Sequence, residues 1–420
     1  METSKREWTW RDSGNHGVAI RALNLASDLV GFSRKSFVPE QLMEKAARRA
    51  GLDDFGPPTF REGLDLLCRE YNADRRITGL GQIAGREMIV GTLANRLQVI
   101  DWYKTHPEVG EEKIETPWVI TGLIRSGTTL TSALFNLDAR LRRPLVGEGE
   151  FPIPPVQLAT RYSDERIARS ARQIERLDKL APPMKAIHPI EATYPQECVL
   201  ITQMDFQSIL FTSIASSPGY QAWYSHSDKR SAYALHRQLL QIWQSTVPTV
   251  RWGSKAPNHM HGIDALMATY PDARLVWCHR DPLVCIPSIA SLSATFLRPF
   301  SRHVDPHEVG RLANEHWLAG VQKLMAYDKS RADGGWCRHL YYNDLVADSA
   351  AALKAAYRHF GDEVDPLHER KIKAWVKQRP KNTFGIHKYS LEDFGLDARK
   401  MREQYAEYIE RYRVPLEHKD

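Results

Sequence analysis

The sequence predicts an α/β fold in which a central parallel sheet is flanked by helices and preceded by a helical N-terminal region. Short apolar runs at residues 116–124 and 273–278 are too short for helices and are typical of buried strands, and residues 338–342 are a third candidate strand. The first two runs are each followed by a segment of helical character, near residues 130–137 and from about Leu283. Strands that alternate with helices favour a mainly parallel sheet.

Residues 1–112 are predicted to form the helical N-terminal region, and residues 113–420 the α/β domain. Apolar residues recur at helical spacing from Leu42 to Ala50, and Gly51 ends that segment. Further helices are expected at residues 60–71 and at about 85–103, where apolar residues again form one stripe. We expect this region to be a packing layer, with a lid over a binding pocket as the alternative.

The composition is that of an ordinary soluble globular protein. Of the 420 residues 42% are hydrophobic and 26% charged, and the net charge of +6 is mild, without a long basic run that would indicate nucleic-acid binding. No stretch approaches the roughly 20 apolar residues that a membrane helix needs, and the N-terminus lacks the apolar segment of a signal peptide. The five cysteines form no CxxC pair, which favours reduced thiols and a cytoplasmic location.

The segment Gly122–Thr129, with the sequence Gly-Leu-Ile-Arg-Ser-Gly-Thr-Thr, lies between the first strand and its helix. Such a turn directs backbone N–H groups and a helix N-terminus at one point, which favours an anion. The spacing is P-loop-like, matching GxxxxGK[ST] except that Thr128 stands where Lys is expected. A sulfuryl group carries one negative charge fewer than a phosphoryl group and can be transferred without a metal. The alternative is a tight turn with no ligand.

The residues Gly122–Leu130 resemble the 5′-phosphosulfate loop of sulfotransferases, especially the bacterial and tyrosylprotein branches. In that family the loop binds the 5′-phosphosulfate end of the sulfuryl donor, 3′-phosphoadenosine 5′-phosphosulfate (PAPS). The resemblance implies donor-binding roles for Arg125, Ser126, Gly127, Thr128 and Thr129.

A second anion site is expected where the strand at residues 273–278 ends. Arg280 follows that strand and Ser288 lies about two turns into the next helix, so both could reach one phosphate. Pairing of Arg280 with Asp281 or another acid is the alternative. The segment is similar to the family's 3′-phosphate motif, and this resemblance implies that Arg280 and Ser288 bind the 3′-phosphate of PAPS.

Direct transfer needs a base for the acceptor proton and a cation for the leaving phosphate. Tyrosylprotein sulfotransferases carry a Gly-Glu-Glu whose first Glu is the base. Residues 147–150 (Gly-Glu-Gly-Glu) resemble it and imply Glu148, although the extra glycine leaves Glu150 open. His188 is a further candidate, because other branches use His. Lys255, in Lys-Ala-Pro, resembles the family's Lys-x-Pro motif and is the expected cation.

Two further segments leave alternatives open. Residues 191–198 contain two acids and are expected either to line the acceptor site or to start a helix. Residues 379–390 resemble the family's late loop that closes over the nucleotide, but without its usual Arg-Lys-Gly triplet, so a basic surface loop is equally compatible. The cationic residues of this segment are Arg379, Lys381, His387 and Lys388.

The expected function is therefore direct in-line transfer of a sulfuryl group from PAPS to the hydroxyl of a small or lipophilic alcohol or phenol, giving PAP and a sulfate ester. No residue spacing typical of a metal site is present, so no metal is expected. A possible homo-oligomer stays open. The competing classes are a nucleotide-dependent kinase, against which Thr128 argues, and a nucleotide-binding protein without catalysis.

Overall fold

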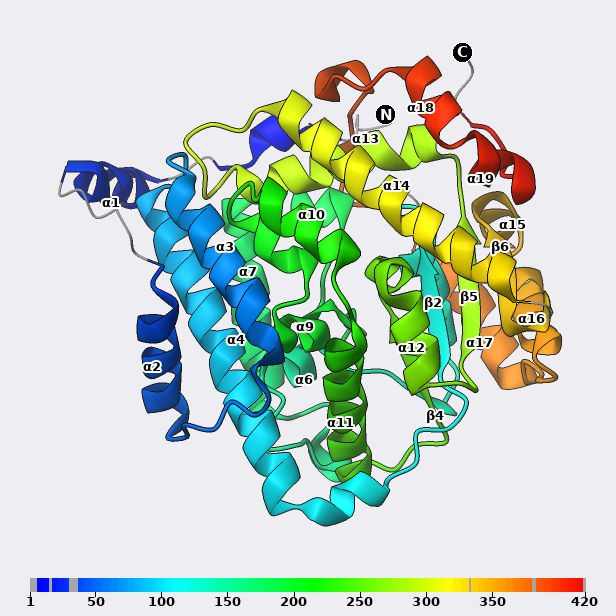
Figure 1. Ribbon diagram of the computed structural model, residues 1–420. Coiled ribbons are helices and arrows are strands. Elements are labelled where there is room, and N and C mark those ends of the chain that lie inside the picture. Colours follow the sequence, from blue (N-terminus) through cyan, green and yellow to red (C-terminus); the bar gives the residue numbers. More distant parts are fainter. Residues whose placement is uncertain (1–5, 15–16, 30–36, 332–333, 380–382, 418–420) are drawn as a thin grey trace.

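A five-stranded parallel sheet in the order β3–β4–β2–β5–β6 forms the centre of the molecule (Figure 1). The computed structural model describes residues 6–14, 17–29, 37–331, 334–379 and 383–417. The strands are β2 (Trp118–Gly122), β3 (Leu141–Arg142), β4 (Arg251–Lys255), β5 (Arg274–His279) and β6 (Cys337–Tyr341). All neighbouring strands in this sheet run parallel. The α/β fold and the strands predicted near residues 116, 273 and 338 are therefore confirmed.

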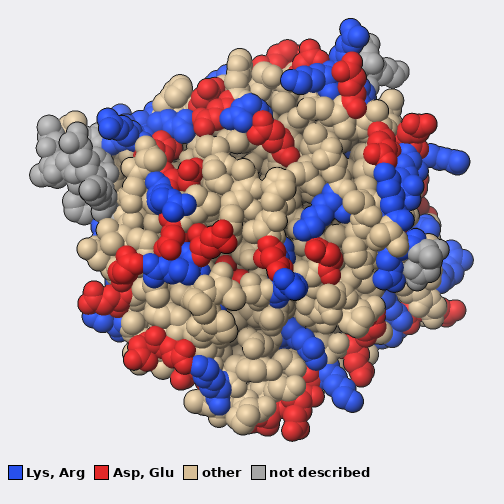
Figure 2. Space-filling view, viewed as in Figure 1, with Lys and Arg blue, Asp and Glu red and all other residues tan. Residues whose placement is uncertain are grey.

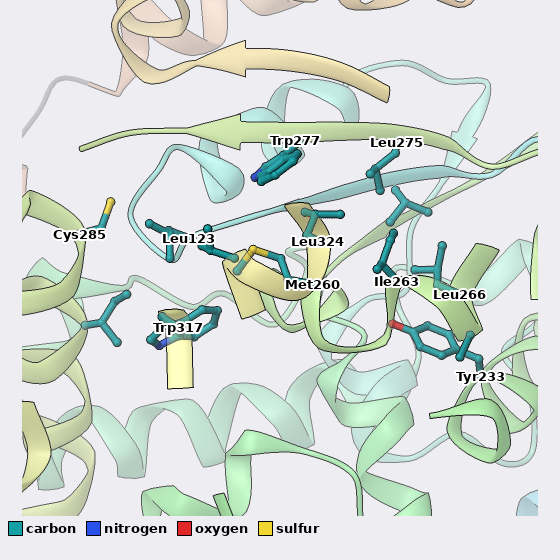
Figure 3. Packing of buried hydrophobic residues seen from close by; sticks show 14 of the residues in the cluster. Leu123, Tyr233, Met260, Ile263, Leu266, Leu275, Trp277, Cys285, Trp317 and Leu324 are labelled. Carbon is teal, nitrogen blue, oxygen red and sulfur yellow. The ribbon is translucent and has the colours of Figure 1, made fainter. Parts of the chain in front are cut away.

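Helices cover both faces of the sheet because successive strand residues point to opposite sides. Val119, Leu275 and Trp277 face one core, and Trp118 and Val276 face the other. The first core is closed by α11 (Arg230–Thr246), α12 (Ile263–Thr269), α13 (Pro282–Leu297) and α14 (Pro306–Ser330). The second is closed by α5 (Thr128–Phe135), α16 (Ser349–His359) and α17 (Pro366–Gln378). Figure 3 shows Trp277 and Leu275 in the first core, together with Leu123, the first residue after β2.

Four helices form the N-terminal region. They are α1 (Val18–Leu29), α2 (Pro39–Ala50), α3 (Arg61–Ala73) and α4 (Gly79–Thr105), so the three predicted helices are confirmed. Residues of α2, α3 and α4 form a second hydrophobic core together with buried residues of segment 206–224 and Phe300. Helix α4 starts six residues earlier than predicted, because Thr78 caps it by accepting a hydrogen bond from the amide of Gly81. Figure 1 shows α2, α3 and α4 on one side of the molecule, next to α10 (Pro218–His226).

Strands β3 and β4 were not expected from the sequence. The β4 segment, Arg-Trp-Gly-Ser-Lys, contains a single large apolar residue and lacks the pattern of a buried strand. It is nevertheless buried over residues 252–255, because it lies between β3 and β2 and hydrogen-bonds to both. Lys255 is therefore the last residue of a buried strand.

The remaining elements connect and cover this framework. The other helices are α6 (Val146–Glu150), α7 (Glu165–Leu180), α8 (Met184–Ile187), α9 (Val199–Thr202), α15 (Tyr342–Ala347), α18 (Ala398–Gln404) and α19 (Ala406–Arg411). Two short strands, β1 (Glu7–Trp8) and β7 (Ile386–His387), pair in parallel. This pairing joins the two predicted parts of the chain, whose division after residue 112 stays a prediction.

The charged residues are interspersed on the face of the molecule in Figure 2. Lysine and arginine alternate with aspartate and glutamate there, and no large patch of one sign gathers over the helices of that face. Among the described residues, no helix has the length and apolar character that would let it cross a membrane.

Candidate active site

A cavity of about 450 Å³ opens at the carboxyl ends of the parallel strands. Ligands of open α/β sheets bind at this edge, where the strand order reverses. The order reverses at β2, because β4 lies on one side of it and β5 on the other. The cavity is lined by charged and polar side chains from several elements: Arg125, Thr128, Thr129, His188, Glu197, Asn258 and Arg280. Four of these, Arg125, Thr128, Thr129 and Arg280, are predicted donor-binding residues.

The loop after β2 forms one wall of this cavity. Gly127, with φ of 95°, ends the loop in the left-handed region, and α5 begins at Thr128. The first amides of a helix have no carbonyl partner within it, so α5 presents donors to an anion at its N-terminus. Ser126 has a different place, since its amide and its hydroxyl both donate to the carbonyl of Leu123, at 3.1 and 2.6 Å. Its side chain holds the turn together.

Arg125 links the loop to two other elements. Its backbone has φ of 73°, a conformation that a non-glycine residue rarely adopts. Its guanidinium donates to the carbonyl of Ile187 at the end of α8, at 2.7 Å. Its own carbonyl accepts from Arg280 at 3.0 Å. Arg280 follows β5 directly, so both predicted anion sites are joined through the backbone of this loop.

Lys255 lies at the carboxyl end of β4 and reaches the loop. Its Nζ donates to the Thr129 hydroxyl at 3.3 Å and forms an ion pair with the Glu197 carboxylate. Glu197 is brought there by its neighbour Cys198, whose amide donates to the Lys255 carbonyl at 3.0 Å. The segment at residues 191–198 therefore lies against β4, and Glu197 lines the cavity.

Arg280 and Ser288 differ in whether their side chains have hydrogen-bond partners among the described residues. The guanidinium of Arg280 donates to both carboxylate oxygens of Glu417, each at 2.8 Å, and stacks 3.8 Å from the ring centroid of Tyr342. Ser288 is fully buried in α13, and its hydroxyl has no hydrogen-bond partner within the part of the chain that the structure describes. Ser288 is not among the residues that line the cavity, so the predicted pairing of Arg280 with Ser288 depends on a polar ligand that reaches this buried hydroxyl.

His188 ends α8 and lines the same cavity. Burial lowers the pKa of its imidazole to about 4, with the positive charge of Lys255 as the next cause. Glu197 acts in the opposite direction and raises it, while Arg125 lowers it further. The ring is therefore neutral at pH 7, with two cations and one carboxylate as its electrostatic neighbours.

Glu148 and Glu150 lie outside this cavity. The Glu148 carboxylate is 1% exposed, accepts from Arg142 at 2.7 Å and caps α6 by accepting from the amide of Leu145 at 2.8 Å. Glu150 accepts from Ser170 at 2.5 Å, and burial raises the pKa of its carboxyl group. It lines a separate cavity between α4, α6 and α7. Of the three predicted base candidates, only His188 lies beside Lys255.

Much of the remaining lining of the cavity is apolar. Four residues of α13 at helical spacing contribute to the cavity, together with Trp317 of α14. The apolar lining includes Ile124, Leu130, Ile190, Val199, Ile209, Leu210, Ile289, Leu292, Phe296, Trp317 and Val346. The cavity therefore offers both polar groups for an anion and apolar surface for a lipophilic group.

The described cationic residues of the predicted late loop contact different parts of the chain. His387 accepts from or donates to the Ser291 hydroxyl at 2.7 Å, and burial, with the charge of Arg125, lowers its pKa to about 4. Lys388 pairs with Glu7, and Arg379 stacks on Trp375. Lys381 lies outside the described residues. The described chain also contains no group of three side chains placed to hold a metal ion.

Sequence reasoning missed several cavity residues. Tyr342 directly follows β6, so its position at the carboxyl end of a predicted strand was a usable signal. Trp317 and Asn258 come from segments that the cavity unites only through tertiary packing. Glu197 belongs to the segment that was expected to line the acceptor site or to start a helix. Its contact with Lys255 depends on the packing of two segments 58 residues apart.

The chain belongs to the sulfotransferase family, whose model matches residues 117–366. It is similar to the crystal structure of sulfotransferase STF9 from Mycobacterium avium, with 28% identity, a TM-score of 0.84 and coverage of 91% of this chain and 98% of that one. It is also similar to sulfotransferase STF1 from Mycobacterium tuberculosis H37Rv, with 28% identity, a TM-score of 0.79 and coverage of 89% and 100%. Among curated proteins, no sequence matches significantly. The predicted family and enzyme class are confirmed, and the family implies a PAPS-like sulfuryl donor.

Proposed function

We propose that this sulfotransferase transfers a sulfuryl group from PAPS to the hydroxyl of a lipophilic alcohol or phenol by direct in-line transfer. The observation that carries the proposal is that the loop after β2 contacts both Lys255 and Arg280, and that the loop and Arg280 line one cavity whose remaining lining is largely apolar. PAPS supplies a sulfuryl group bound to a phosphate that can leave. The products are PAP and a sulfate ester.

The charged and polar residues of the site have separate roles in this proposal. The N-terminus of α5, with Thr128, Thr129 and Arg125, binds the 5′-phosphosulfate, while Arg280 and Ser288 bind the 3′-phosphate. Lys255 stabilises the negative charge that develops on the leaving phosphate oxygen, since its ammonium already contacts Thr129 at the start of α5. The 3′ role of Ser288 is supported by its buried, unpartnered hydroxyl.

For the base we propose Glu197 in preference to Glu148 and Glu150. Its carboxylate lines the cavity and contacts Lys255, whereas the other two are engaged elsewhere. The proton of the acceptor hydroxyl passes to Glu197 as the acceptor oxygen bonds to sulfur and the sulfur–phosphate oxygen bond breaks. His188 stays as the alternative base, because it lines the same cavity.

A cytoplasmic location remains part of the proposal. Its support is that all five cysteines are unpaired and buried, as expected of reduced thiols.

Calorimetric titration with PAP, PAPS and ATP–Mg²⁺ tests the donor. We expect PAP and PAPS to bind and ATP–Mg²⁺ to bind far more weakly. Tight binding of ATP–Mg²⁺ without binding of PAP would overturn the proposal and favour a kinase. Transfer is then measured with labelled PAPS and a mixture of phenols and long-chain alcohols, where labelled lipophilic esters are the expected product.

The base and the cation are tested by substitution. Lys255→Met and Glu197→Gln should each lower the transfer rate by about 10²- to 10³-fold, since each removes a group that acts in the transition state. Glu191→Gln is the matched control, because Glu191 is exposed on the same segment and should retain the rate. If His188→Gln loses transfer while Glu197→Gln keeps it, the histidine is the base.

A further inference from the structure

The C-terminal segment reaches the site through Glu417. Val414 is buried in the main core, which anchors the segment. The amide of Glu417 donates to Asp281 at 2.8 Å. Asp281 is itself fixed, since it caps α13 and pairs with Arg402. The backbone at Glu417 is thus held beside the start of α13, and its side chain extends to Arg280.

The contact between Glu417 and Arg280 uses the donors that a phosphate would need. Nε and one Nη of the guanidinium each donate to a different carboxylate oxygen at 2.8 Å, in the two-pronged geometry that guanidinium forms with carboxylate and phosphate alike. The other Nη donates to the carbonyl of Arg125. Both partners are partly shielded from water, with side-chain exposures of 16% for Arg280 and 25% for Glu417.

We propose that Glu417 is a determinant of donor selectivity that competes with the 3′-phosphate of the nucleotide for Arg280. The inference rests on the proposed function, in which Arg280 binds that phosphate. A phosphate cannot take the two-pronged contact while the carboxylate holds it, and two anions at one guanidinium repel each other. Binding of a 3′-phosphorylated nucleotide is then an exchange of one anion for another.

The exchange has a consequence that differs between nucleotides. A nucleotide with a 3′-phosphate must displace Glu417, so its binding is weakened by the free energy of the Glu417–Arg280 ion pair. A nucleotide with only a 5′-phosphate leaves the pair intact. Glu417 therefore weakens binding of PAP and leaves binding of AMP unchanged. It thereby lowers the ratio of the affinity for PAP to the affinity for AMP. Because Glu417 belongs to the C-terminal segment, binding of a 3′-phosphate at Arg280 also breaks a contact that holds this segment.

Calorimetric titrations of PAP and AMP into the wild type, Glu417→Gln and Glu417→Ala test this. Both variants should bind PAP about three- to tenfold more tightly, the range expected for loss of a partly exposed ion pair, and AMP within about twofold of the wild type. Glu410→Gln is the matched control, since it removes an equal charge from an exposed position of the same C-terminal segment. In an Arg280→Ala background, Glu417→Gln should leave PAP binding unchanged.

Two results would overturn the proposal. Weaker or unchanged PAP binding in both Glu417 variants would mean that Glu417 orients Arg280 instead of competing for it. Equal tightening for PAP and AMP would mean a general effect of charge. If the wild type fails to bind PAP at all, the donor assignment itself is wrong, which is a separate result from either of these.

Discussion

Glu148 and Glu197 each face a cation, but the two pairs lie in different surroundings. Glu148 and Arg142 are both almost fully buried, and the carboxylate also caps α6. In the other pair Lys255 is also buried, at 4% exposed, but Glu197 lines the cavity and is 20% exposed. A buried pair cannot separate without leaving a charge in the protein interior, whereas a pair at a cavity can exchange its partner for a ligand. The same chemistry therefore stabilises the fold at one place and is available for catalysis at the other.

The largest expected effect is on stability, at the buried pair. Glu148→Ala should lower the free energy of unfolding by about 3–5 kcal/mol, because Arg142 is then left charged and buried without its partner. Denaturant unfolding followed by circular dichroism measures the change. Replacing both residues by apolar ones of similar size, Arg142→Met with Glu148→Leu, should recover part of the loss.

The opposite outcome at this position would change the assignment of the base. If Glu148→Gln were as stable as the wild type but lost transfer while still binding PAP, the carboxylate would act in the reaction, as the family motif implies. The assignment of a structural role to Glu148 and a catalytic role to Glu197 would then be wrong.

The contrast between Glu148 and Glu197 also shows which features of the structure could be predicted from the sequence. Strands β2 and β5 were predictable because each is a short and mainly apolar run, and the loops at their ends followed from them, whereas β6 (Cys-Arg-His-Leu-Tyr) has a weaker pattern. Strand β4 was not, because its burial comes from its neighbours in the sheet rather than from its own polar sequence. The motif at residues 147–150 gave the positions of two acids but not their partners, since Arg142 and Ser170 reach them only in the folded chain.

A second prediction compares two histidines of lowered pKa. Burial alone lowers the pKa of His236 to about 4, whereas the pKa of about 4 at His188 also reflects Lys255 and Arg125. PAP brings negative charge to those cations, so it should raise the pKa of His188 and leave that of His236 unchanged. NMR titration of the imidazole Cε1 protons with and without PAP measures both, with His188→Gln to assign the signal. Equal behaviour of the two rings would contradict a donor bound beside Lys255.

The same two histidines give the sign of the pH dependence of stability. Each folded-state pKa lies below the ordinary value of 6.5, so the unfolded chain binds more protons than the folded chain between about pH 6.5 and 4. Their contribution to stability is fully present above pH 6.5 and is lost as the pH falls towards 4. Thermal melting across this range should therefore show a falling midpoint on acidification, and PAP should reduce the part that His188 contributes.

The smallest expected effect is on the stability of the pair at the cavity. Glu197→Gln should lower the free energy of unfolding by about 1–2 kcal/mol, less than Glu148→Ala, because the amide keeps a hydrogen-bond acceptor for Lys255, whose ammonium also donates to the Thr129 hydroxyl. Denaturant unfolding beside Glu148→Ala measures the difference directly. A loss as large as that of Glu148→Ala would mean that the Glu197–Lys255 pair is a structural ion pair of the fold. Such a pair would not release its carboxylate to an acceptor hydroxyl, and the base would have to be sought at His188.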